Sequence, residues 1–148
     1  MPSYENIHLS DELHKSETTV ECVGSNENFY KVILKAGDKT IGTAELYYHE
    51  MPVPHYKVSE IYVYPDKRGK GYGSQILSSI EEKLRTENIA GLLQDVVGSY
   101  EANAKGAVGM YERRGWIPVP NRKNFYAYNM PDNIDVDVFS NSANAAKQ

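Results

Sequence analysis

Three glycines alternate with three large side chains in the segment 68–73, which reads Arg-Gly-Lys-Gly-Tyr-Gly. The start of a helix leaves backbone N–H groups unpaired and carries a partial positive charge, so it attracts phosphate. Glycines let the backbone come close to an anion, and Arg68 and Lys70 add two full positive charges at the same place. The segment therefore predicts a phosphate-binding helix start. The structural alternative is a helix entry that needs glycine only for its turn.

The residues on either side of this segment predict a strand before it and a helix after it. β-Branched and aromatic residues crowd 58–64, and Pro65 closes the run. A helix over 72–86 follows from the apolar residues at helical spacing, which are Ile76, Leu77, Ile80 and Leu84. The charged residues of this segment are expected on the other side of the helix, and they are Glu81, Glu82, Lys83 and Arg85.

Two common phosphate-binding motifs do not fit this loop. The chain has no G-x-x-x-x-G-K-[ST] segment, and a dinucleotide fingerprint would need glycine at the position of Ser74. The residues instead match the order Arg-x-x-Gly-x-Gly, with Val63 and Pro65 just ahead. In order and spacing, residues 63–73 closely resemble the acetyl-CoA segment of the GNAT superfamily of N-acetyltransferases.

The resemblance implies acetyl-CoA as a cosubstrate and a way of binding it. The pantetheine arm would pair with the main chain like an added strand, and the pyrophosphate would rest on residues 68–74. The residues implicated in this way are Ile61, Tyr62, Val63, Arg68, Gly69, Lys70, Gly71, Tyr72, Gly73 and Ser74.

A second segment carries the same resemblance. Residues 107–116, which read Ala-Val-Gly-Met-Tyr-Glu-Arg-Arg-Gly-Trp, look like the family's A-x-x-L-Y-E-K-x-G-F segment. In that family the tyrosine lies near the coenzyme sulfur and often serves as general acid, a role that the match assigns to Tyr111. An asparagine often precedes this tyrosine by seven positions. Ala104 stands there, and Asn103, one residue earlier, is the candidate coenzyme contact.

Acetyl transfer from a thioester to an amine makes three chemical demands. The amine must be unprotonated, although a typical alkylamine has a pKa near ~10. The carbonyl oxygen needs a hydrogen-bond donor as it becomes negative. The departing thiolate needs a proton, which a phenol can supply because its pKa of ~10 lies above that of a thiol at ~8.5. Tyr111 is therefore the expected proton donor, and the structural alternative is a core anchor on an apolar helix face.

The candidate for the general base is Glu60. It precedes Tyr62 by two residues on the expected strand, so both side chains point to one face while Ile61 and Val63 point to the other. A carboxylate half-buried near Tyr62 and Tyr64 would have its pKa raised by desolvation and could take a proton directly or through water. The alternatives are a solvated strand position for Glu60, or a base further along the chain among Ser99, Tyr100 and Glu101.

The remaining residues complete an α+β pattern. A second helix is expected over 104–114, which Gly115 ends. Further strands are expected over 4–9, 18–23, 29–36, 40–49, 90–97, 116–119 and 124–130. A loop is expected over 24–28. The strand, helix, strand order over 58–97 implies parallel pairing with a right-handed crossover. The resemblance implies a three-layer GNAT-like fold, with a central mixed, mostly antiparallel sheet, a parallel central strand pair and helices on both faces.

A single domain is expected over residues 1–130, followed by a polar C-terminal tail over 131–148. The composition of the tail predicts flexibility, although three of its residues are apolar enough to dock locally, namely Val136, Val138 and Phe139. The family usually places two helices between its first strand and the hairpin 29–49, where this chain has only a short polar stretch. The substrate groove is therefore expected to be unusually open, or to be completed by a second subunit in a homodimer.

Composition narrows the location and the partners. The 148 residues are 41% hydrophobic and 24% charged, as in an ordinary soluble globule. A formal net charge of −4 does not suggest a nucleic acid or a membrane surface as a partner. Cys22 has no second cysteine with which to form an internal disulfide, and the sequence shows neither a signal peptide nor a membrane-spanning run. A cytoplasmic location is expected.

The expected function is N-acetyl transfer. An acetyl group would move from acetyl-CoA to a primary amine, of a small molecule or a protein, by direct attack in a ternary complex. Two alternatives stay open: a non-catalytic acyl-CoA-binding sensor or partner module, and a nucleotide-binding domain with a different glycine-loop logic. No metal is expected, since His49 and His55 around Glu50 lack the H-E-x-x-H spacing of zinc enzymes.

Overall fold

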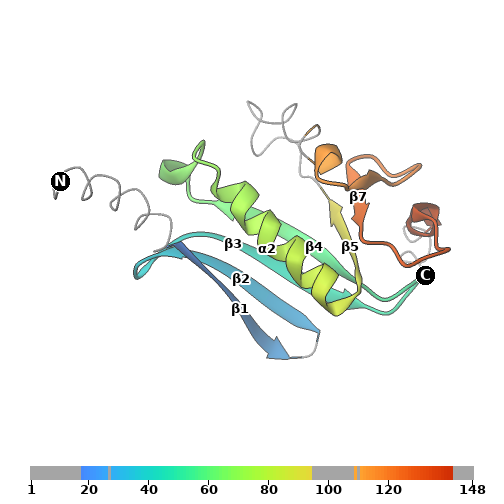
Figure 1. Ribbon diagram of the computed structural model, residues 1–148, viewed down its shortest axis with the longest axis horizontal. Coiled ribbons are helices and arrows are strands. Elements are labelled where there is room, and N and C mark those ends of the chain that lie inside the picture. The colour runs from blue at the N-terminus through green and yellow to red at the C-terminus, as the bar shows by residue number, and fades with distance from the viewer. Residues whose placement is uncertain (1–17, 27, 95–108, 110, 142–148) are drawn as a thin grey trace, which may run out of the picture. The chain divides into compact units, whose positions relative to one another are not determined.

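The protein is represented by a computed structural model that describes residues 18–26, 28–94, 109 and 111–141 (Figure 1). The contacts between residues divide the chain into two compact units. Unit 1 comprises Met1–Glu45 and Glu60–Ser79, and unit 2 comprises Leu46–Ser59 and Ile80–Gln148. Three elements contribute residues to both units, the strands β3 (Lys39–His49) and β4 (His55–Val63) and the helix α2 (Tyr72–Glu87).

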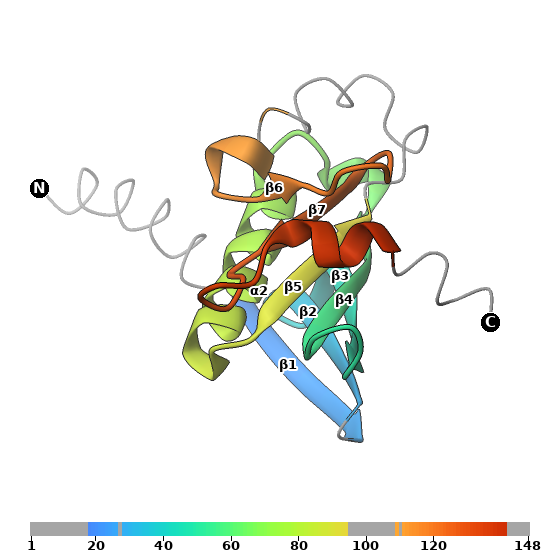
Figure 2. The same cartoon turned by 90° about the vertical axis from the view of Figure 1, so that its right-hand side faces the viewer.

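The strands form one mixed sheet (Figure 2). The other strands are β1 (Thr18–Asn26), β2 (Phe29–Ala36), β5 (Ala90–Gln94), β6 (Ile117–Pro118) and β7 (Phe125–Tyr128). Their order in the sheet is β1-β2-β3-β4-β5-β7-β6. β4 and β5 pair in parallel, with α2 between them in the chain, whereas the pairs β1–β2, β5–β7 and β6–β7 are antiparallel. The expected α+β fold, with a parallel strand pair in a mixed sheet, is confirmed.

The hairpin of β1 and β2 is longer than the sequence predicted. β1 stays paired from Thr18 to Asn26, which lies opposite Phe29, and the register is irregular between Gly24 and Asn26. The prediction of a loop over 24–28 was therefore wrong in its first half. Pairing with β2 outweighs the low strand propensity of glycine and asparagine, and the irregularity absorbs the misfit.

Unit 1 has an apolar core between its strands and the first turns of α2. The buried residues of this core include Val32, Leu34, Ile41, Ala44, Ile76 and Leu77. Gly42 in β3 marks a very close approach, because a Cβ at this position would lie 2.8 Å from Cδ1 of Ile76 and 2.9 Å from the carbonyl oxygen of Tyr62. Only glycine fits there, so the strands set how closely the start of α2 can approach them.

Unit 2 has its own core around β5 and β7. This cluster contains Leu92, Val119, Ala127, Val136 and Phe139, the last two from the 3₁₀ helix η3 (Val136–Asn141). Val136 and Phe139 thus dock as their apolar character allowed. The packed part of the chain therefore extends beyond residue 130, the predicted end of the domain.

The second half of α2 lies close to β5 within unit 2. A Cβ at Gly91 would lie 2.5 Å from Cδ1 of Leu84 and 3.4 Å from Cη2 of Trp116. Leu84, Trp116 and Gly91 are all buried. A larger residue at this position of β5 would therefore push the helix and the indole away from the strand.

Asn129 ties the end of α2 to the residue before β5. The helix ends at Glu87, the next residue Asn88 has a left-handed φ of 55°, and the N–H of Ile89 donates to the carbonyl of Leu84 at 3.0 Å. The side-chain amide of Asn129 donates to the carbonyls of Leu84 and Ile89, each at 2.9 Å. One side chain thus satisfies two backbone acceptors at a helix end.

The other predicted elements agree with the structure to within a few residues where they are described. In the predicted helix 104–114, residues 109 and 111–113 are helical, and Gly115 follows with a φ of 97°. The rest of that helix, the strand over 4–9 and the residues 95–97 lie outside the described residues. No helix in the described part of the chain is both long enough and apolar enough to cross a bilayer.

His55, at the start of β4, is the buried histidine of unit 2. Its Nδ1 donates to the carbonyl oxygen of Val53 at 2.7 Å, and its ring centroid lies 5.3 Å from that of His49 and 4.8 Å from that of Phe139. Burial lowers the pKa of His55, and the charges of His49 and Lys57 lower it further, against the opposing effect of the hydrogen bond to Val53.

The two hydrogen bonds of Asn129 can be weighed by replacing it with alanine, which keeps a backbone whose φ is 58°. The free energy of unfolding in urea should fall by about 2–5 kcal/mol, from two lost hydrogen bonds and from the strain of a left-handed alanine. Asn133→Ala is the matched control, since Asn133 is exposed and has a φ of 69°. Equal losses in both variants would show that the amide of Asn129 contributes nothing.

The lowered pKa of His55 makes stability depend on pH. Between the folded value and ~6.5 the unfolded chain binds a proton that the folded chain does not, so stability should fall as the pH falls through ~6.5. His55→Phe keeps a ring beside Phe139 but cannot titrate. Its urea midpoint should therefore drop less than that of the wild type between about pH 7.5 and about pH 5.5. His49→Phe, at the exposed ring of the pair, should keep most of the wild-type drop, and an unaltered drop in His55→Phe would contradict the assignment.

Candidate functional site

The segment between β4 and α2 leaves the sheet through a short 3₁₀ turn. The N–H of Tyr64 donates to the carbonyl of Ile41 at 3.0 Å, and Pro65–Lys67 forms the turn η1. The N–H of Lys67 then donates to the carbonyl of Tyr64 at 2.8 Å. These contacts anchor the start of the glycine segment to β3 and β4.

The glycine segment itself is an open loop. Gly69 and Gly71 have φ values of 79° and 84°, a left-handed conformation that side-chain-bearing residues rarely adopt. A Cβ at either position would meet no described atom within 4 Å. Glycine is therefore required by the backbone conformation rather than by crowding, and the described residues leave space beside the loop.

The start of α2 offers the backbone groups that the sequence predicted. Helical hydrogen bonding begins with the N–H of Gln75, which donates to the carbonyl of Gly71 at 3.1 Å. A helix start directs the N–H groups of its first turn toward the segment before it, which here is the glycine segment. The first turn contains no Asp or Glu, so no carboxylate of that turn offsets the partial positive charge of this helix end.

The two cations of the loop differ in their surroundings. Nε of Arg68 donates to the carbonyl oxygen of Val63 at 2.8 Å, and its guanidinium carbon lies 5.3 Å from the ring centroid of Tyr62. Arg68 thus folds back on the end of β4 and holds the loop to that strand. Lys70, by contrast, is exposed to solvent.

Glu60 lies in β4 and is exposed. The expectation of a half-buried carboxylate was therefore wrong. The ring of Tyr62 packs toward the loop, with its centroid 5.7 Å from that of Tyr64 and the guanidinium of Arg68 over it. The role of Glu60 as general base stays a prediction. Ile61 and Tyr62 are half-buried and Val63 is buried at the end of the strand.

Tyr111 belongs to unit 2 and is 7% exposed. Its ring centroid lies 5.2 Å from that of Tyr126 and 6.4 Å from that of Trp116. Its carbonyl accepts hydrogen bonds from the N–H groups of Arg114 at 3.1 Å and Trp116 at 3.0 Å, which end the helix together with Gly115. The burial of the ring fits both the core anchor and the general acid, so the acid role stays a prediction.

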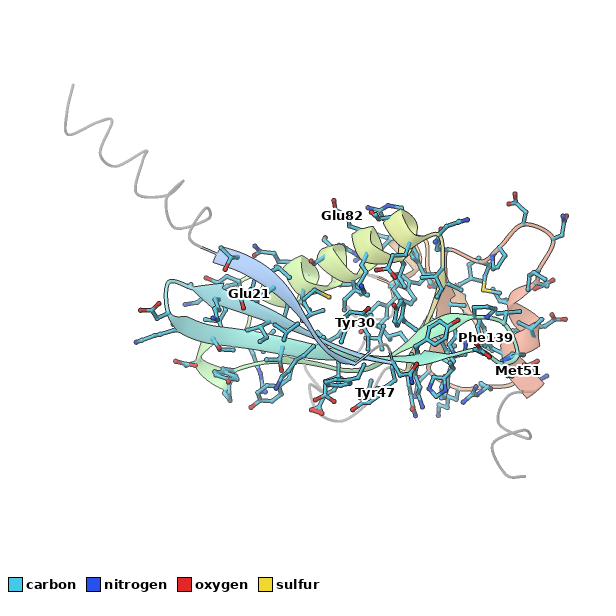
Figure 3. All side chains as sticks on the ribbon, turned by 90° about the horizontal axis from the view of Figure 1, so that it is seen from below. Glu21, Tyr30, Tyr47, Met51, Glu82 and Phe139 are labelled. Carbon is cyan, nitrogen blue, oxygen red and sulfur yellow. The ribbon has the colours of Figure 1, made fainter. Side chains whose placement is uncertain are left out.

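A buried carboxylate near Tyr111 was not foreseen. Glu81 is 5% exposed, although the helical spacing predicted that it would lie on the charged side of α2. Its side chain is bound by Arg114 and Trp116. The helical spacing contained the signal, since Glu81 follows Leu77 by four residues and precedes Leu84 by three. Figure 3 shows Glu82, the next residue, pointing away from the sheet as expected.

Several predicted residues lie outside the described part of the chain. These are the candidate coenzyme contact Asn103 and the alternative bases Ser99, Tyr100 and Glu101. His49 and His55 stack on each other, and among the described residues no group of three or more potential metal ligands occurs.

The profile of the Acetyltransferase (GNAT) family matches residues 2–116 of the chain. A GNAT family acetyltransferase from Elizabethkingia anophelis with acetyl-CoA bound has a TM-score of 0.58 at 13% identity, over 77% of this chain and 99% of that one. The PaiA N-acetyltransferase from Thermoplasma acidophilum in complex with coenzyme A has a TM-score of 0.51 at 19% identity, over 70% and 60% of the two chains. At these identities the two structures show a shared fold. A search among curated proteins finds no match.

Proposed function

The chain belongs to the acetyltransferase (GNAT) family, and we propose that it moves an acetyl group from acetyl-CoA to a primary amine by direct attack in a ternary complex. The observation that carries the proposal is the loop 68–71, with two left-handed glycines directly before α2. This loop presents backbone N–H groups and space at a helix end that no acidic residue of the first turn neutralises. Those are the properties that a diphosphate needs.

The residues of the loop divide the work of binding. The backbone N–H groups before Gln75 would donate hydrogen bonds to the pyrophosphate oxygens, and Lys70 would add a positive charge. Arg68 would act mainly by holding the loop to β4, because its Nε already donates to Val63. The main chain of Ile61–Val63 would pair with the amide groups of the pantetheine arm.

In the reaction, the amine nitrogen forms a bond to the thioester carbon, and the carbon–sulfur bond then breaks. The amine loses a proton to a base, for which Glu60 is the candidate, directly or through water. The departing thiolate takes a proton from a phenol, for which Tyr111 is the candidate. A phenol can do this because its pKa of ~10 exceeds the ~8.5 of a thiol.

The acceptor is proposed as a primary amine, of a small molecule or a protein. The deciding experiment incubates the protein with acetyl-CoA and a panel of polyamines, aminoglycosides, amino acids and peptides. Release of free thiol should be measured together with the mass of the acetylated amine. Tight binding of acetyl-CoA without thiol release, across the whole panel, would favour the non-catalytic sensor. Competition by ATP or NAD in a thermal-shift assay would instead favour a nucleotide site.

The glycine loop can be tested with Gly71→Val. A β-branched residue at a φ of 84° is strained, so the loop should rearrange and the affinity for acetyl-CoA should fall by at least roughly 10²-fold. Gly37→Val is the matched control, because Gly37 has a φ of 63° with no atom within 4 Å but lies in the turn between β2 and β3. Calorimetric titration measures both. Retained micromolar binding by Gly71→Val would count against the loop as the diphosphate site.

The acid role can be tested with Tyr111→Phe, which removes only the phenol oxygen. Turnover on an identified amine should fall roughly 10²-fold, with little effect on the KM for acetyl-CoA. Tyr126→Phe is the matched control, since its ring contacts Tyr111 in the same cluster. It should change turnover less than about 3-fold. Unchanged turnover in Tyr111→Phe would reject the acid role and leave the core anchor.

A further inference from the structure

Glu81 is a charged residue in an apolar setting. It is 5% exposed, and its neighbours on the same side of α2, Leu77, Ile80 and Leu84, are fully buried. An ionised carboxylate in such a place is costly unless several donors compensate it. The donors that bind Glu81 therefore indicate what the charge is for.

Three donated hydrogen bonds converge on this carboxylate. Arg114 binds it with two nitrogens, Nε to Oε2 at 2.8 Å and Nη2 to Oε1 at 2.9 Å, and Trp116 donates from Nε1 to Oε2 at 2.7 Å. The paired arrangement of Arg114 fixes the plane of its guanidinium as well as its position. The bond from Trp116 fixes the rotation of the indole.

Both donors are also bound to Tyr111. The backbone N–H groups of Arg114 and Trp116 donate to the carbonyl of Tyr111, and the indole packs edge-on to the Tyr111 ring with centroids 6.4 Å apart. The carboxylate thus holds, by their side chains, the two residues that close the helix onto Tyr111. In the motif A-x-x-L-Y-E-K-x-G-F, Arg114 occupies the last x position and Trp116 the F position. The motif itself specifies no hydrogen-bond donor at either position.

We propose that Glu81 is a positioning residue, which sets the orientation of Tyr111 through Arg114 and Trp116 without touching substrate. The inference rests on the proposed acid role of Tyr111 and names what places its phenol. Stability alone does not account for a buried ion pair, because well-packed apolar residues often stabilise a core equally well or better. A directional network instead restricts the ring of Tyr111 to one arrangement.

The kinetic test compares Glu81→Gln with Glu82→Gln, its exposed neighbour on the same helix. Glutamine keeps the shape and an acceptor but loses the charge that Arg114 needs. The kcat of Glu81→Gln should fall roughly 10- to 10²-fold, while the KM for acetyl-CoA changes less than about 3-fold. Glu82→Gln should keep the wild-type kcat. Where Tyr111→Phe lowers kcat, an unchanged kcat in a folded Glu81→Gln would overturn the proposal.

A double-mutant cycle separates positioning from general damage. In the Tyr111→Phe background, Glu81→Gln should lower kcat by no more than about 2-fold, because the phenol that it orients is already absent. An equal fractional loss in both backgrounds would indicate a structural role and would overturn the proposal. Where Glu81→Gln fails to fold, Trp116→Phe replaces it, since this variant removes one hydrogen bond and leaves Glu81 paired with Arg114.

A spectroscopic readout keeps this inference distinct from the acid role. In protein labelled with 3-fluorotyrosine, the fluorine resonance of Tyr111 is the one missing from Tyr111→Phe. A shifted or broadened Tyr111 resonance in Glu81→Gln, with none in Glu82→Gln, would support the positioning even where Tyr111→Phe keeps full turnover and the acid role fails. A resonance unmoved in Glu81→Gln would overturn it.

Discussion

The close approach of α2 to its strands is the constraint on which the rest of the structure depends. In unit 1 the side chain of Ile76 occupies the space that a Cβ at Gly42 would need, and in unit 2 Leu84 does the same at Gly91. These two glycines let the helix settle directly on backbone. The distance between the start of α2 and the strands of unit 1 is therefore fixed, and with it the end of the glycine loop. The same packing in unit 2 buries Glu81, whose carboxylate accepts three hydrogen bonds.

Local chemistry predicted the elements and the loop well. The order of strands, the span of α2 and the left-handed glycines follow from propensity, periodicity and the need for a tight turn. Features that depend on partners distant in sequence were missed. Glu81 is buried because Arg114 and Trp116 reach it, and β1 continues through Gly24 because β2 supplies the hydrogen bonds. The periodicity of a single helix or strand does not reveal such distant partners.

The candidate site shows the same division. Residues whose task belongs to the backbone, such as Gly69 and Gly71, have the predicted conformation. Residues whose task depends on side-chain surroundings were harder to judge, because burial is set by neighbouring elements. Glu60 is exposed, the ring of Tyr62 lies beside Arg68, and Nε of Arg68 donates to the carbonyl of Val63. A binding site formed by backbone amides is thus easier to predict from a sequence than one formed by carboxylate side chains.

The docking of η3 has a consequence for any shortened version of the chain. Val136 and Phe139 cover Leu92 and Ala127, and Arg122 donates to the carbonyl of Phe139 at 3.1 Å. A polypeptide that ended after β7 would expose Leu92 and Ala127 of unit 2. Exposed apolar patches favour self-association. η3 thus shields apolar residues of unit 2 from water, and a truncation that removes η3 would expose them.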